Sequence, residues 1–187
     1  MTSPERRTFI NVEPSEEVKR FLTENPNARW DQCLGYVLDH WPQVRDGKID
    51  YLVEGGTALR LLFPQRQDPA DVDILTRSQQ MNKHFRNSRK FDVKHITDWY
   101  ASRLHPYNSN AFDQEGGNFL FDMNQSVEFG NRKVLVLNSL GLAVSKTLRY
   151  LHRDLRKKDL RDLTLLNQDS TQIRQIIKKI KTIYPQP

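Results

Sequence analysis

Residues 52–75 read LVEGGTALRLLFPQRQDPADVDIL. An apolar run meets a glycine pair, a helix-like stretch follows, and a loop with two prolines leads to a second apolar run that carries two aspartates. This order predicts a strand, a glycine turn, a helix, a loop and a second strand. Because successive strand side chains alternate between faces, Asp71 and Asp73 are expected to point the same way.

The two aspartates and the glycine turn together indicate nucleotide chemistry. Two like charges at this spacing repel one another unless positive charge lies between them, and oxygen ligands of this kind suit Mg²⁺ or Mn²⁺. At the turn, Gly55 and Gly56 let backbone N–H groups approach a phosphate closely, and the N-terminus of the following helix adds the positive end of its dipole. The segment therefore predicts a metal site beside a phosphate site.

These motifs resemble those of a known superfamily. The segments Gly55-Gly56-Thr57-Ala58-Leu59 and Asp71-Val72-Asp73-Ile74 are similar to the nucleotidyltransferase signature. The resemblance is greatest to its abortive-infection toxin branch, the AbiEii/MenT-like proteins of type IV toxin–antitoxin systems, and it covers Leu52–Leu166. It implies transfer of a nucleotidyl group from a nucleoside triphosphate, with release of pyrophosphate.

The resemblance also implies roles for the two motifs. Asp71 and Asp73 are expected to hold Mg²⁺ or Mn²⁺ against the triphosphate. Gly55, Gly56 and Thr57 are expected to bind its phosphates through backbone N–H groups and a hydroxyl.

A third carboxylate is usual in this superfamily, on a neighbouring strand, where it binds metal or takes the proton of the attacking hydroxyl. Asp122 lies in the apolar run Phe-Leu-Phe-Asp-Met, where an unpaired charge is costly, which favours a role at the site. Asp92, in another expected strand, and Glu128, in an expected hairpin, are its rivals. Spacing does not decide among the three.

Downstream residues match the toxin branch less closely. Lys146 resembles the branch's helix lysine, which contacts the triphosphate, although it also fits a basic, solvated helix face. Asp159 resembles the branch's downstream aspartate, with Asp162 as the alternative. The branch has an arginine and then a serine ahead of the aspartate pair. Here Arg66 is shifted by one residue and the serine is absent. The contact of Arg66 with a nucleotide and the choice of nucleotide therefore stay open.

Composition limits the class of protein. No apolar run reaches the length of about 18 residues needed for a membrane span, and Met1–Asn11 lacks an apolar signal core, so a cytoplasmic protein is expected. The lone cysteine, Cys33, excludes an internal disulfide. Residues 1–140 hold 18 Lys and Arg against 19 Asp and Glu, whereas residues 141–187 hold 11 against 4. This basic excess favours a polyanionic partner at the C-terminal quarter, although a solvated helix surface is also compatible with it.

The whole chain reads as a mixed α/β protein. Two N-terminal helices are expected before the first strand, and further strands over residues 91–96, 118–123, 126–129 and 133–137. We therefore expect a nucleotidyltransferase-like mixed sheet with helices over residues 1–138, followed by a basic helical region over residues 139–187.

Three functions agree with these observations. The first is nucleotidyl transfer to RNA: the basic excess favours RNA, and the resemblance implies a tRNA 3′ end, a toxin and a cognate antitoxin. The second is the same chemistry on a protein hydroxyl, an AMPylation-like modification. The third is a non-catalytic module that binds nucleic acid or an antitoxin.

Overall fold

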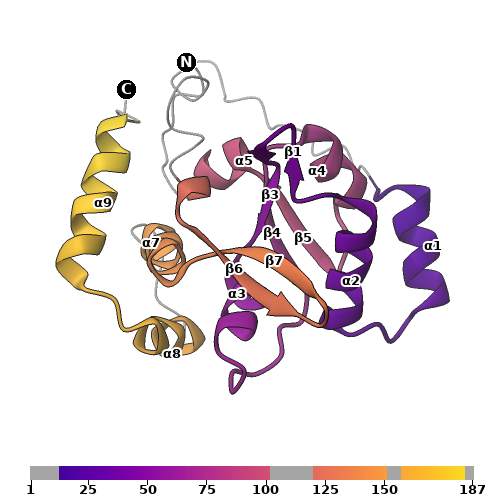
Figure 1. The fold of residues 1–187 in the computed structure, drawn as a ribbon, viewed down its shortest axis with the longest axis horizontal. Coiled ribbons are helices and arrows are strands. Elements are labelled where there is room, and N and C mark those ends of the chain that lie inside the picture. The colour runs from indigo at the N-terminus through magenta and orange to yellow at the C-terminus, as the bar shows by residue number, and fades with distance from the viewer. Residues whose placement is uncertain (1–12, 102–119, 151–156, 184–187) are drawn as a thin grey trace, which may run out of the picture.

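The structure is a computed structural model and describes residues 13–101, 120–150 and 157–183. These residues form a mixed α/β fold, as predicted, in which helices flank a five-stranded sheet (Figure 1). The helices are α1 Glu16–Glu24, α2 Trp30–His40, α3 Gly55–Leu62, α4 Gln79–Phe85, α5 Ile96–Ala101, α7 Ser139–Tyr150, α8 Lys157–Leu166 and α9 Ser170–Ile183. The strands are β1 Val44–Arg45, β2 Lys48–Ile49, β3 Tyr51–Val53, β4 Val72–Thr76, β5 Phe91–His95, β6 Asn124–Phe129 and β7 Arg132–Leu137.

The main sheet has the strand order β5-β4-β3-β7-β6. Strands β4 and β5 run parallel, as do β3 and β7, whereas β3–β4 and β6–β7 are antiparallel. The expected hairpin around Gly130-Asn131 is confirmed as the β6–β7 pair. In Figure 1, α1 and α2 lie on one side of the sheet and α7, α8 and α9 on the other.

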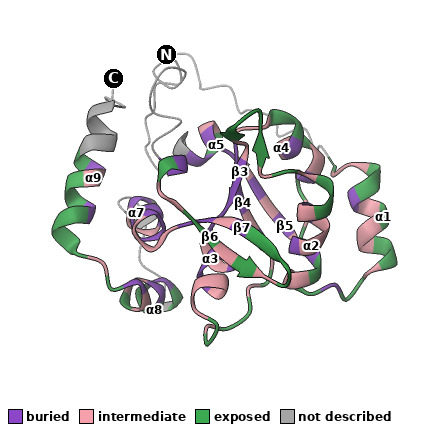
Figure 2. Cartoon of the chain, in the orientation of Figure 1, coloured by how far each residue is buried: buried purple, intermediate pink, exposed green. Residues whose placement is uncertain are grey.

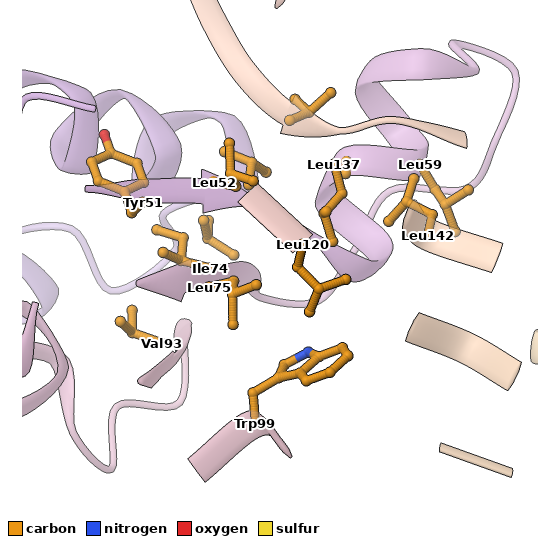
Figure 3. Packing of buried hydrophobic residues seen from close by; sticks show 14 of the residues in the cluster. Tyr51, Leu52, Leu59, Ile74, Leu75, Val93, Trp99, Leu120, Leu137 and Leu142 are labelled. Carbon is orange, nitrogen blue, oxygen red and sulfur yellow. The ribbon is translucent and has the colours of Figure 1, made fainter. Parts of the chain in front are cut away.

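The hydrophobic core lies between the sheet and its flanking helices. Figure 2 shows buried positions along the central strands and on the inner side of α7, while the outer sides of α9 and β6 are exposed. Burying a large apolar side chain contributes about 1.5–3 kcal/mol, so this layer is the main stabilising feature of the fold. Figure 3 shows part of it, with labelled side chains Tyr51, Leu52, Leu59, Ile74, Leu75, Val93, Trp99, Leu120, Leu137 and Leu142.

The first helices form for the local reasons that the sequence indicates. Ser15 precedes α1, and its hydroxyl accepts a hydrogen bond from Val18 N at 3.3 Å. Helix α2 buries a stripe that includes Cys33, Leu34 and Val37, so this face of the helix belongs to the core. No helix among the described residues is long and apolar enough to cross a membrane.

One local prediction needs correction. The strand expected over residues 118–123 is wrong for residues 120–122, which are helical, while residues 118 and 119 lie outside the described residues. Helix α4 ends at Phe85, and two residues later Asn87 adopts a left-handed conformation with φ of 57°. The division of the chain at residue 138 stays a prediction.

Candidate functional site

Three carboxylates meet at one end of strands β4 and β5. The register of this parallel pair places Asp73 directly beside Asp92, so both side chains leave the same face of the sheet. Asp71 lies two residues before Asp73, just ahead of β4, and shares that face. One oxygen from each of the three lies within 4.8 Å of the others, and all three side chains are half-buried. The structure thus brings together the predicted pair and Asp92, one of the predicted candidates for the third carboxylate.

Asp122 and Glu128 lie elsewhere. Asp122 is exposed on a helical turn, and its negative charge acts on Arg77, which follows the end of β4 opposite to Asp71. Glu128 is exposed on β6, which is an edge strand of the sheet. Of the three candidates for the third carboxylate, Asp92 and not Asp122 lies beside the aspartate pair, because residues 120–122 do not form a strand beside β4.

The glycine turn is bound to the aspartate pair itself. Gly56 N donates to Asp73 Oδ2 at 2.7 Å, and Thr57 N lies 3.4 Å from the same oxygen. The Thr57 hydroxyl accepts from Asp73 N at 3.0 Å and donates to Asp71 O at 3.1 Å. Asp73 thus satisfies the free N–H groups at the start of α3, where the sequence predicted a phosphate. The phosphate contact of this turn stays a prediction.

The close approach of the Asp73 side chain to the turn requires a glycine at position 55. Its φ is +55°, in the left-handed region that favours glycine. A Cβ atom at this position would lie 2.6 Å from Asp73 Cγ, so a side chain cannot fit without moving the aspartate. The glycine therefore allows the helix to begin directly against the carboxylate.

Electrostatics at the site favour a cation. Burial raises the pKa of Asp73 to about 7, and three neighbouring carboxylates, Glu54 foremost, act in the same direction. Burial raises the pKa of Asp71 as well, and the charge of Asp92 adds to this effect. Neighbouring carboxylates oppose one another's ionisation, and a divalent cation between them removes that opposition, so that all of them ionise. An all-carboxylate donor set fits Mg²⁺ or Mn²⁺.

Glu54 is a site residue that the sequence reading missed. It follows β3, its backbone N–H donates to Asp73 O at 2.9 Å, and only 3% of its surface is exposed. Its carboxylate accepts a hydrogen bond from Trp99 Nε1 at 2.9 Å. The available signal was a charged residue directly between a buried strand and the glycine pair, where an acid needs a partner.

Lys94 also belongs to the site and was missed. It lies two residues after Asp92 on β5, so the two side chains share a face, and its Nζ forms an ion pair with that carboxylate. Its positive charge lowers the pKa of Asp71 and Asp73, against the effect of burial. Lys94 is thus a cation built into the carboxylate cluster.

The C-terminal helices contribute a buried charge network. Lys146 of α7 places Nζ 2.8 Å from Asp162 Oδ2 and 3.3 Å from Asp159 Oδ1, both on α8. The side chain of Lys146 is 13% exposed, so it does not belong to a solvated basic face. Asp159 and Asp162 are 1% and 6% exposed, and both pair with Lys146.

Arg66 joins this network from the loop between α3 and β4. Its Nε and Nη2 donate to the two oxygens of Asp162 at 2.9 and 3.1 Å. Its Nη1 donates to the carbonyl oxygens of Gly56 at 3.3 Å and Gln67 at 3.2 Å. The residue that the sequence predicted as a nucleotide contact is thus bound to α8 and to the glycine turn.

Most of these groups border one cavity of about 660 Å³, while Glu54 and Lys94 line a smaller one of about 30 Å³ that shares Gly55 and Asp73 with it. The larger cavity has room for a small-molecule ligand, since such sites occupy about 300–1,000 Å³. Its lining contains six carboxylates and four cationic side chains, so it carries an excess of two formal negative charges. The charged lining residues are Arg66, Asp68, Asp71, Asp73, Asp92, Lys146, Lys158, Asp159, Arg161 and Asp162.

Comparison with known proteins gives one structural likeness. No family model matches this sequence, and no curated protein matches it. The fold is similar to the crystal structure of an antigenic nucleotidyltransferase-like protein from Paracoccidioides brasiliensis, with a TM-score of 0.45 and 14% sequence identity. The match covers 90% of this chain and 89% of that one. At this level the likeness describes the general arrangement of strands and helices and says nothing of a substrate.

Proposed function

We propose that this protein is a metal-dependent nucleotidyltransferase that moves a nucleoside monophosphate from a nucleoside triphosphate to an acceptor, with release of pyrophosphate. One observation carries the proposal: carboxylates from adjacent strands, Asp71, Asp73 and Asp92, converge in a cavity that also contains four cationic side chains. Carboxylates can hold a metal ion, and the cationic side chains of Lys146, Lys158 and Arg161 can meet phosphate groups in the same space, as a metal–triphosphate complex needs.

The charge of the cavity explains why a metal is required. A triphosphate entering alone would meet an excess of two negative charges, whereas a divalent cation between the aspartates would offset that excess. Asp71, Asp73 and Asp92 would hold Mg²⁺ or Mn²⁺. When bound, the cation neutralises charge on the transferring phosphate and helps to orient it.

The remaining site residues have roles that follow from their positions. Lys146 Nζ gives two of its three N–H groups to carboxylates, which leaves one for a phosphate oxygen. The exposed Lys158 and Arg161 of α8 line the same cavity and can meet the triphosphate or an anionic acceptor. The position of Asp92 on the strand beside Asp73 supports a role in holding the metal or in accepting the proton of the attacking hydroxyl.

We propose RNA as the acceptor, and specifically a tRNA 3′ end. The net charge of +7 over residues 141–187, with exposed cations at the cavity itself, supports a polyanion over a protein hydroxyl. The sequence resemblance further supports a toxin that is paired with a cognate antitoxin.

The test is transfer of label from each of four α-labelled nucleoside triphosphates in the presence of Mg²⁺, total RNA and cell extract. The wild-type protein should label RNA, and Asp73→Asn and Asp92→Asn should abolish labelling. Asp122→Asn, which removes an exposed carboxylate outside the cluster, is the matched control and should retain activity. Label on protein would favour the AMPylation-like alternative, and no label on either would favour a binding module.

A further inference from the structure

The loop between α3 and β4 forms one wall of the cavity. Residues 65–70 all line it, and they lead directly into Asp71. Two arginine–aspartate ion pairs hold this loop, one at the surface and one in the interior. Arg60 on α3 binds the exposed Asp68 at the surface, with Nε 2.8 Å from Oδ1, whereas Arg66 points inward and binds Asp162 on α8. The inward pair joins residues 96 positions apart in the chain.

The guanidinium group of Arg66 uses nearly all of its hydrogen-bond donors. A guanidinium group has five N–H donors, and four hydrogen bonds leave Arg66, two to Asp162 and one each to the carbonyl oxygens of Gly56 and Gln67. Its side chain is 18% exposed. Arg66 thus has little capacity left to bind a nucleotide, and its contacts instead join the loop, the glycine turn and α8.

Asp162 is the centre of this arrangement. It is 6% exposed, and its two oxygens accept from Arg66 on one side and from Lys146 Nζ on the other. A buried carboxylate is strongly destabilising without partners, so both cations are held where its oxygens point. The bidentate geometry fixes direction as well as distance, since both N–H groups must meet the carboxylate in one plane.

We propose that Arg66 and Asp162 form a clamp that positions the cavity wall and Lys146, and that neither is a nucleotide ligand. The clamp holds the loop ahead of Asp71 against α8 and keeps Lys146 Nζ at the cavity. The predicted effect of the clamp on turnover rests on the proposed function, whereas its effect on the position of the loop does not. Positioning of this kind acts on turnover more than on binding, because a displacement of about 1 Å can cost about 100-fold in rate.

The test compares Arg66→Gln, Asp162→Asn and the double variant with the wild type. Nucleotide transfer should show a kcat lowered about 10- to 100-fold and a KM changed by less than about threefold, with the double variant no worse than either single one. Arg66→Lys should fail to restore turnover, because lysine keeps the charge but not the planar fork. Arg60→Gln, which breaks the surface pair on the same loop, is the matched control and should change kcat by less than about twofold.

Hydrogen exchange of the peptide over residues 62–71 gives a readout that needs no activity. Exchange there should be faster by about tenfold or more in both single variants and by less than about threefold in Arg60→Gln, whose lost contacts to Asp68 and Pro64 O are exposed. If a single variant does not fold, the double variant, which leaves neither charge unpaired, provides the same comparison. A rise in KM at constant kcat, full rescue by Arg66→Lys, or unchanged exchange would each overturn the clamp. Absence of transfer by the wild type would overturn the proposed function alone.

Discussion

Replacing Asp73 by asparagine should stabilise the metal-free protein at pH 8. The carboxylate of Asp73 is surrounded by Glu54, Asp71 and Asp92, and burial together with these charges raises its pKa to about 7 from an ordinary 3.8. Folding therefore opposes its ionisation. The amide of asparagine has the same shape, carries no charge, and keeps an oxygen that can accept from Gly56 N.

The size and sign of the effect follow from proton linkage. Below about pH 4, Asp73 is neutral in both folded and unfolded chains, so its ionisation contributes nothing to stability. Between about pH 4 and 7 the unfolded chain loses the proton while the folded one keeps it, and the stability of the wild type falls as the pH rises. The difference between 3.8 and about 7 corresponds to about 4 kcal/mol in the free energy of unfolding above pH 7.

Urea unfolding in EDTA at pH 5, 6, 7 and 8 measures this difference directly. The gain of Asp73→Asn over wild type should grow with pH and level off near pH 8. Mg²⁺ should narrow this difference, because a cation that binds only the folded wild type at 100 times its Kd stabilises the wild type by about 2.7 kcal/mol. Asp122→Asn, which removes an exposed carboxylate outside the cluster, is the control variant for this comparison.

Two results would refute this reasoning. A wild type more stable than Asp73→Asn at pH 8 without metal would mean that the carboxylate is favourably paired and not repelled. A difference independent of pH would mean that Asp73 ionises normally in the folded protein. Either result would remove the electrostatic support for a cation among these side chains.

Three other predictions concern neighbouring residues. Asp92→Asn should lower nucleotide transfer by about 100-fold or more and abolish Mn²⁺ binding measured by calorimetry, while Asp122→Asn stays within about twofold of wild type. Lys146→Ala should lower the free energy of unfolding, measured in urea, by about 3–5 kcal/mol, because two buried carboxylates on α8 lose their shared partner. A loss below about 1 kcal/mol would indicate instead that the side chain of Lys146 is solvated. Gly55→Ala should lower both stability and Mn²⁺ affinity, since its Cβ would displace the adjacent aspartate, whereas Gly47→Ala, with φ of 72° and open space around it, should show only a backbone cost of about 1–3 kcal/mol.

The motif residues were predictable because their geometry is local. Alternation along β4 places Asp71 and Asp73 on one face whatever the strand packs against. The left-handed conformation at Gly55 follows from a helix that begins immediately after a strand. Similarly, the helical spacing of the apolar residues in α2 places them on one face, and Leu34 and Val37 are buried there.

The third carboxylate was not predictable in this way. Asp92 lies in a segment that alternates apolar and polar residues and Asp122 in a short apolar run, and each could have formed a strand beside the aspartate pair. The choice depends on which strand pairs with β4, and the parallel register of β5 gives Asp92 that place. Pairing between distant segments is decided by the packing of both faces of a sheet, which no local pattern records.

What the sequence by itself determined is therefore an acidic pair, one residue apart, beside a glycine turn, since backbone sterics and strand alternation act over a few residues. Only the tertiary structure decided what surrounds that pair: Asp92 beside it, Glu54 behind it, and Lys146 and Arg66 held by α8. Repulsion among buried charges, and the cations that offset it, depend on distances between residues far apart in the chain. Those distances exist only once the helices have packed against the sheet.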